Sequence, residues 1–201
     1  MMVKICGITN VEDAQAAVEA GAGAIGFNFF PKSPRYLTPE QAASIAGQLP
    51  PEVLKVGVFV DEPPETVLRI VIEARLDVAQ LHGDEPPGEW PENLRIWKAL
   101  RANPDEIAGA MERWKAEAFL LDTPATGGFG GTGRSFDWRL AAGLPGRIIL
   151  AGGLDASNVA EAIRAAAPWG VDASSRLECA PGRKDHDKVR QFVRAALSES
   201  L

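Results

Sequence analysis

Residues 2–8 read MVKICGI, and this apolar run predicts a buried β-strand at the start of the chain. Lys4 and Cys6 stand two positions apart, so their side chains point to the same face of the strand. Thr9 and Glu12 then have the spacing of a capping box that opens a helix. A thiol at the carboxyl end of a buried strand lies where α/β enzymes place their chemistry. The alternative is a small buried hydrophobe, which is the usual role of a free cysteine.

The composition is that of an ordinary globular protein, with 46% hydrophobic and 24% charged residues in a chain of 201. A net charge of −6 argues against a nucleic-acid partner, which requires a basic surface. Two cysteines imply no disulfide framework, and no apolar run approaches the ~20 residues that span a membrane. The first residues lack the regions of a signal peptide, so the expected location is the cytoplasm.

The pattern of the first strand recurs along the whole chain. Seven further short apolar runs alternate with segments of helical composition, at residues 24–30, 54–60, 78–83, 95–100, 118–123, 147–151 and 170–175. Strands that alternate with helices pair in parallel through right-handed crossovers. Eight such units predict a single-domain (β/α)8 TIM barrel over residues 1–201. The alternative is an open doubly wound sheet, although the first strand lacks a G-x-G-x-x-G dinucleotide fingerprint.

Polar residues or glycines stand at the carboxyl ends of these strands: Cys6, Asn28, Asp61, His82, Lys98, Asp122, Gly152 and Asp172. In a barrel these ends form the active-site face. Strand ends are also polar simply because loops are exposed. That explanation fits Asp122 poorly, because an apolar run precedes it. A carboxylate there must be partnered, exposed at the mouth of the barrel or partly protonated.

Small residues gather late in the chain, at residues 131–133, at Gly152 and Gly153, and at Ser174 and Ser175. Each segment alone is an ordinary turn. Two of them follow the seventh and eighth strands, where many barrels bind a phosphate through backbone N–H groups and a helix dipole. We therefore expect a phosphate site there. A metal site is not expected, because the two histidines and two cysteines are far apart in the sequence.

Several motifs occur in a fixed order along nearly the whole chain: KICGI at 4–8, GFNF at 26–29, SPRY at 33–36, QLHG at 80–83, LLDT at 120–123, GTG at 131–133, AGGL at 151–154, and GVD at 170–172 followed by the two serines. This ordered set resembles the phosphoribosylanthranilate isomerase family of tryptophan biosynthesis. The resemblance implies a cofactor-free Amadori rearrangement of N-(5-phosphoribosyl)anthranilate to 1-(2-carboxyphenylamino)-1-deoxyribulose 5-phosphate.

The resemblance also implies roles for particular residues. Asp122 would be the general acid that protonates the ribose ring oxygen, and Cys6 the general base that takes the C2 proton. Arg35 would bind the anthranilate carboxylate, and His82 and Asp172 would contact the substrate. The phosphate site would be lined by Gly133, Gly152, Gly153, Ser174 and Ser175. The family includes monomers and homodimers, and we expect a homodimer.

The thiol of Cys6 can act as a base only where some thiolate is present. We expect the adjacent helix N-terminus to favour the thiolate, and Lys4 to be paired with Asp172. The family usually has glycine after the paired serines, whereas this chain has Arg176. Arg176 would either strain a backbone that needs positive φ or add a phosphate contact. We expect a tolerated backbone with the side chain turned outward.

Two other functions fit parts of the pattern. A related isomerase of histidine synthesis performs the same chemistry on a larger substrate, but such enzymes have aspartate where Cys6 stands. A catalytically inert phosphate-binding barrel would have no need of both Cys6 and Asp122. The pattern therefore favours the tryptophan-pathway reaction.

Overall fold

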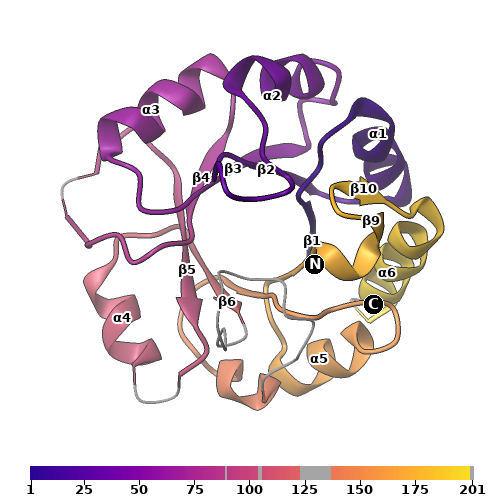
Figure 1. Ribbon diagram of the computed structural model, residues 1–201. Coiled ribbons are helices and arrows are strands. Elements are labelled where there is room, and N and C mark those ends of the chain that lie inside the picture. Colours follow the sequence, from indigo (N-terminus) through magenta and orange to yellow (C-terminus); the bar gives the residue numbers. More distant parts are fainter. Residues whose placement is uncertain (89, 104–105, 123–136, 200–201) are drawn as a thin grey trace.

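Eight parallel strands close into a barrel in the computed structural model, which describes residues 1–88, 90–103, 106–122 and 137–199. The strands follow one another around the barrel in chain order (Figure 1). They are β1 (Met2–Cys6), β2 (Ala24–Asn28), β3 (Leu54–Phe59), β4 (Val78–Leu81), β5 (Ile96–Arg101), β6 (Ala118–Asp122), β7 (Ile148–Leu150) and β8 (Gly170–Ala173). The predicted (β/α)8 barrel is confirmed, and the alternative of an open sheet is wrong.

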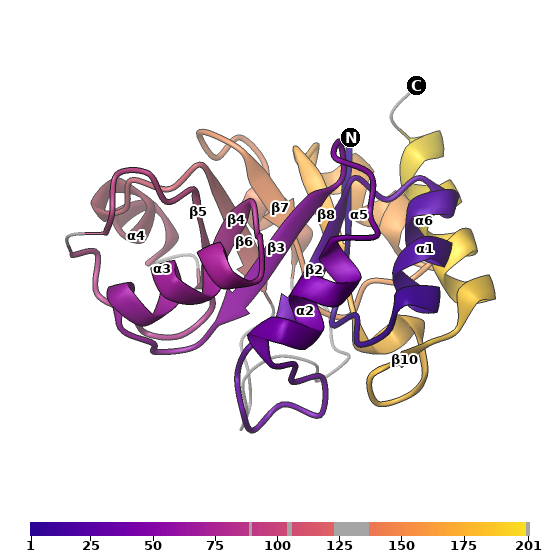
Figure 2. The same ribbon diagram turned by 90° about the horizontal axis from the view of Figure 1, so that it is seen from above.

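Helices surround the barrel (Figure 1). They are α1 (Val11–Ala20), α2 (Pro39–Ala46), α3 (Pro64–Glu73), α4 (Ile107–Arg113), α5 (Val159–Ala166) and α6 (His186–Ser198), with short 3₁₀ helices η1 (Trp138–Ala141) and η2 (Ser175–Leu177). Helices α1 and α6 lie side by side next to β1 (Figure 2). None of the helices that the structure describes has the length and apolar character needed to cross a membrane.

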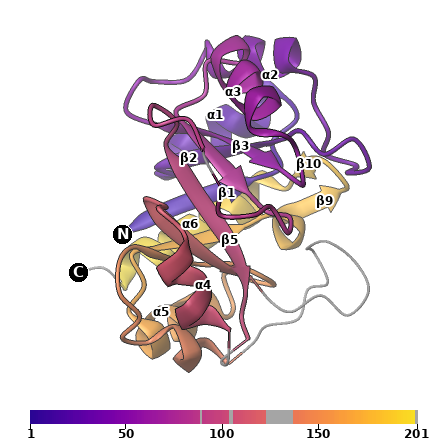
Figure 3. The same ribbon diagram turned by 90° about the vertical axis from the view of Figure 1, so that its left-hand side faces the viewer.

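A two-stranded hairpin of β9 (Glu178–Ala180) and β10 (Arg183–Lys184) follows η2 and was not predicted. The hairpin lies at the carboxyl end of the barrel strands, whereas the start of β1 and the end of α6 lie at the opposite end (Figure 3). Its position explains an error in the sequence analysis. Thr9 does not cap α1, because its hydroxyl donates to the carbonyl oxygen of Gly182 in this hairpin. Asn10 is the N-cap instead and accepts from the backbone N–H of Asp13 at 2.8 Å.

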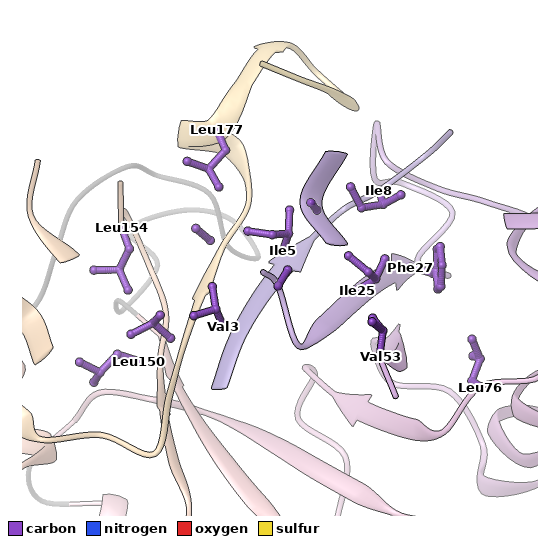
Figure 4. Packing of buried hydrophobic residues seen from close by; sticks show 14 of the residues in the cluster. Val3, Ile5, Ile8, Ile25, Phe27, Val53, Leu76, Leu150, Leu154 and Leu177 are labelled. Carbon is purple, nitrogen blue, oxygen red and sulfur yellow. The ribbon is translucent and has the colours of Figure 1, made fainter. Parts of the chain in front are cut away.

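The buried apolar residues form two layers. Alternation along each strand sends one set of side chains outward, where Val3 and Ile5 of β1 pack beside Ile25 of β2 (Figure 4). The other set fills the barrel interior and includes Trp97, which packs edge-on against Trp169 with ring centroids 5.9 Å apart. Because Val3 and Ile5 face outward, Lys4 and Cys6 point into the barrel.

Candidate active site

A cavity of about 360 Å³ opens at the carboxyl ends of the strands. Every predicted site residue that the structure describes lines it: Cys6, Arg35, His82, Asp122, Gly152, Gly153, Asp172, Ser174 and Ser175. Gly133, predicted for the phosphate site, lies outside the described residues. The parallel strands account for this convergence, because their carboxyl ends meet on one face of the barrel.

A buried ion pair joins β1 to β8 below the cavity. Lys4 Nζ lies 2.9 Å from Asp172 Oδ1, and the Lys4 side chain is fully buried. The two residues are register partners in the barrel wall, so backbone pairing brings them together. Burial disfavours the ammonium, but the Asp172 carboxylate outweighs this and raises the pKa of Lys4. The predicted pairing of Lys4 with Asp172 is confirmed.

The thiol of Cys6 lies beside this pair. Burial disfavours the thiolate and raises the pKa of Cys6, although the Lys4 ammonium opposes the shift. The direction is opposite to the lowering that we expected from the adjacent helix N-terminus. The physical reason is that Asp172 already neutralises Lys4, while desolvation acts on the whole thiol.

Two glycines make room for the thiol and its neighbour Arg35. A Cβ atom on Gly26 of β2 would lie 2.8 Å from Cys6 Sγ and 3.1 Å from Lys4 Cε. Gly7 has a φ of +73°, and a Cβ there would lie 2.4 Å from Arg35 Cδ. Glycine is therefore required at both positions for the side chains to occupy their present places.

Asp122 ends β6 and faces His82, which follows β4. The distance from His82 Nε2 to Asp122 Oδ2 is 3.3 Å, and both side chains are mostly buried. His82 Nδ1 lies 3.0 Å from Nε2 of Gln80, a residue that the sequence analysis did not single out. Its signal was available, because Gln80 precedes His82 by two positions and so shares its face.

Arg35 is held by two residues that the sequence analysis missed. Its Nε and Nη2 each donate to the Glu178 carboxylate at 2.7 Å, a bidentate pair. Lys184 Nζ also donates to Glu178 Oε1, at 2.8 Å, and to the carbonyl oxygen of Ser174. Burial alone would raise the pKa of Glu178, but the hydrogen bonds from Arg35 and Lys184 outweigh it and lower the pKa.

The predicted phosphate segments form one wall of the cavity. Gly152 and Gly153 have φ of 82° and 66°, which turns the chain sharply after β7. Ser174 and Ser175 lead into η2 after β8. Arg176 keeps an ordinary negative φ, so the expectation of a tolerated backbone is confirmed. Its side chain does not simply turn outward as expected, because it is 42% exposed but also lines the cavity, with Nη1 2.9 Å from Asp155 Oδ2.

The described residues offer no candidate metal site. Among residues 1–88, 90–103, 106–122 and 137–199, no three His, Cys, Asp or Glu side chains are grouped so that they could hold a metal ion.

Comparisons with known proteins point to one family. The family model for N-(5'-phosphoribosyl)anthranilate (PRA) isomerase matches residues 3–195. The N-(5'-phosphoribosyl)anthranilate isomerase of Solibacter usitatus is 55% identical over 196 residues, covering 98% of this chain and 97% of the relative. The enzyme of Pelobacter propionicus is 50% identical, covering 96% of this chain and 94% of the relative.

Solved structures give the same result. The phosphoribosyl anthranilate isomerase of Thermotoga maritima superposes with a TM-score of 0.88 at 40% identity, covering 98% of this chain and 99% of that one. A phosphoribosyl anthranilate isomerase in complex with reduced 1-(o-carboxyphenylamino)-1-deoxyribulose 5-phosphate gives a TM-score of 0.84 at 40% identity, with the same coverage. The sequence motifs, the closed barrel and these full-length matches together show that the chain belongs to the phosphoribosylanthranilate isomerase family.

Proposed function

We propose that this chain, as one domain, isomerises N-(5-phosphoribosyl)anthranilate, with Asp122 as general acid and Cys6 as general base. One observation carries the assignment: these two groups line the same cavity although they are 116 positions apart in the sequence, on β6 and β1. A relative 40% identical to this chain holds a reduced form of the product. Each well-placed acid or base contributes roughly 10²–10⁴-fold to the rate.

The first step opens the ribose ring. Asp122 gives a proton to the ring oxygen as the bond between C1 and that oxygen breaks, and the bonding electrons stay on the oxygen. The lone pair of the anthranilate nitrogen forms a double bond to C1, which leaves a cationic Schiff base. Asp122 ends this step as a carboxylate.

The second step removes the C2 proton. The thiolate of Cys6 takes it, and the electrons of the C–H bond form a double bond between C1 and C2 that neutralises the Schiff base. The resulting enolamine becomes the product when C1 gains a proton and the C2 hydroxyl loses one. Burial raises the pKa of Cys6, so the thiol must first release its proton to solvent, and the positive charge on the bound intermediate favours the thiolate that remains.

The remaining groups bind the two ends of the substrate. Glu178 occupies the Nε and Nη2 side of Arg35, which leaves Nη1 for the anthranilate carboxylate. The phosphate is assigned to the wall of Gly152, Gly153, Ser174 and Ser175, which line the cavity. Backbone N–H groups of such turns are the usual ligands of a phosphate. His82 and Asp172 contact the ribose between these ends.

A homodimer in the cytoplasm completes the proposal. The support for assembly is a Thermotoga maritima relative, 41% identical, that is described as a dimeric enzyme from which monomers were generated. Light scattering of the purified chain at micromolar concentration tests it, and a single species of one-chain mass would contradict it.

The function is tested by the loss of anthranilate fluorescence when the purified chain is mixed with phosphoribosylanthranilate. The wild type should turn over, and Asp122→Asn and Cys6→Ala should each lose at least 100-fold in kcat. Turnover only of the larger histidine-pathway substrate would favour the related isomerase. Binding of phosphate esters without any turnover would identify an inert barrel.

A further inference from the structure

Gln80 is a buried polar residue with half of its hydrogen bonding unexplained. It lies on β4, is 1% exposed and lines the cavity. Its Nε2 lies 3.0 Å from His82 Nδ1. Its Oε1 is buried and has no hydrogen-bond partner among the residues that the structure describes. A buried carbonyl without a partner carries a desolvation cost of about 1–3 kcal/mol, so this atom requires an explanation.

Gln80, His82 and Asp122 form a continuous chain of contacts. His82 touches Gln80 through Nδ1 and Asp122 through Nε2, at 3.0 and 3.3 Å. With Gln80 Nε2 facing Nδ1, the imidazole must accept at Nδ1 and is neutral. A half-turn of the amide about Cγ–Cδ places Oε1 at Nδ1 instead. The ring then carries a proton on Nδ1, and Nε2 becomes the nitrogen that gains and loses a proton beside Asp122.

The protonated form of the His82–Asp122 pair selects between these orientations. In either orientation the amide atom that points away from His82 lacks a hydrogen-bond partner among the described residues. The desolvation cost of that atom is therefore similar in both orientations. The hydrogen bond to His82 Nδ1 does differ, because one from a protonated imidazole to a carbonyl is about twice as strong as one between neutral groups. The proton on the pair therefore favours the orientation with Oε1 at Nδ1.

We propose that Gln80 is a positioning residue that holds the His82–Asp122 pair in its proton-loaded form. The inference rests on the proposed role of Asp122 as general acid. To act as an acid, Asp122 must hold a proton, and an imidazole 3.3 Å away that shares its proton can supply one. The proton passes from His82 Nε2 through Asp122 to the ribose oxygen. The ring is then neutral, and it is reloaded with a proton from solvent.

Other charged groups lie around Gln80, His82 and Asp122, on several of the neighbouring elements. Lys98 of β5 donates to the carbonyl oxygens of Leu81 and Gly83, which flank His82, and to Glu85. Among the residues that the structure describes, the other titratable or charged groups near residues 82–85 or across the cavity are Asp61, Asp84, Cys6, Lys32, Arg35, Asp172 and Arg176. None of these is changed by substitution of Gln80, so they form a constant background in the test.

Long-range proton–nitrogen NMR spectra of the uniformly ¹⁵N-labelled chain test the proposal without any turnover. The chain has two histidines, and His186→Gln assigns the signals of His82 by elimination. We expect the loaded His82 of the wild type to carry protons on both ring nitrogens. In Gln80→Met the second ring proton should be lost at a pH about one unit lower, because the charge-assisted hydrogen bond is gone. In Gln80→Glu it should be lost at higher pH.

The alkaline limb of kcat/KM should move in the same two directions in these variants. Gln48→Met, which makes the same change at an exposed helix end, should leave both readouts unchanged. A merely structural Gln80 would lower the unfolding midpoint and leave the titration of His82 in place, which would overturn the proposal. If the NMR shifts appear in a chain without isomerase turnover, the proposed function fails and the positioning role of Gln80 stands.

Discussion

Arg35 donates two parallel hydrogen bonds of 2.7 Å to Glu178, and the two residues are 143 positions apart in the sequence. Glu178 is in turn bound by the buried ammonium of Lys184. The guanidinium is therefore fixed before a substrate carboxylate reaches it. A preorganised cation binds more tightly, because less side-chain entropy is lost on binding.

Glu178→Gln should raise KM about tenfold and change kcat much less. The amide keeps one hydrogen bond to Arg35 but loses the bidentate charged pair, so the guanidinium is held less firmly. Steady-state kinetics measure this split. Glu117→Gln is the matched control, because Glu117 forms the same kind of fork with Arg95 away from the cavity. An equal rise in KM for both variants would refute the role of Glu178.

The same carboxylate makes stability depend on pH. The folded-state pKa of Glu178 is lowered, so its stabilising contribution is complete above the unfolded value of ~4.3 and disappears as pH falls through the folded value. Urea unfolding of the wild type and Glu178→Gln should therefore differ clearly at pH 7. The difference should shrink steadily below pH ~4. A gap that stays constant to pH 2 would be inconsistent with this linkage.

Cys6→Ala should reduce kcat by about 10²–10⁴-fold and abolish the dependence of the remaining rate on thiol ionisation. Burial raises the pKa of Cys6, so the wild-type rate should still be rising with pH at pH 8. Rates measured from pH 6 to 9.5 test both points. Cys179→Ala changes an exposed thiol outside the cavity and should behave like the wild type. A wild-type rise that persists in Cys6→Ala would remove Cys6 from the role of base.

Lys4→Met should destabilise the fold by about 3–5 kcal/mol, because it leaves the Asp172 carboxylate buried without its partner. Lys4→Met combined with Asp172→Leu removes both charges and should recover much of the loss. Denaturant unfolding measures both variants, independently of activity. A double variant that is as unstable as the sum of the single ones would show that the two charges are not coupled.

Gly26→Ala should lower kcat by at least tenfold, because the new methyl group would occupy the space of the Cys6 sulfur. The variant should lose stability as well, since inserted atoms in a packed interior cost about 1–3 kcal/mol. Gly88→Ala is the control, because a Cβ there meets nothing within 4 Å. Full activity of Gly26→Ala would mean that the exact place of the thiol is unimportant.

The parts of the site that strand periodicity controls could be predicted from the sequence. Cys6, Asp122 and Asp172 stand at or near strand ends, and Lys4 shares a face with Cys6, so one closed barrel brings them together. Contacts made by loop residues follow no periodic pattern and could not be predicted in this way. The pairing of Arg35 with Glu178 depends on a hairpin that no pattern indicated.

Competition between equivalent groups also limited the prediction. Thr9 and Asn10 are both good N-cap residues, and the choice was made by a distant carbonyl at Gly182 that uses the Thr9 hydroxyl. The direction of the Cys6 pKa shift likewise depended on how much solvent the folded barrel removes from the thiol. Neither the Gly182 carbonyl nor the burial of the thiol can be read from the sequence around the residue that it affects.

The ion pair between Lys4 and Asp172 has a consequence for the synthesis of the protein itself on the ribosome. It links the first strand of the barrel to the last, so a ribosome must release residues 170–173 before Lys4 can meet its counter-ion. Until then an otherwise apolar strand carries an unmatched ammonium that prefers water to a closed interior. Chains that lack β8 are therefore disfavoured from closing the barrel, so closure waits until synthesis has reached the eighth strand.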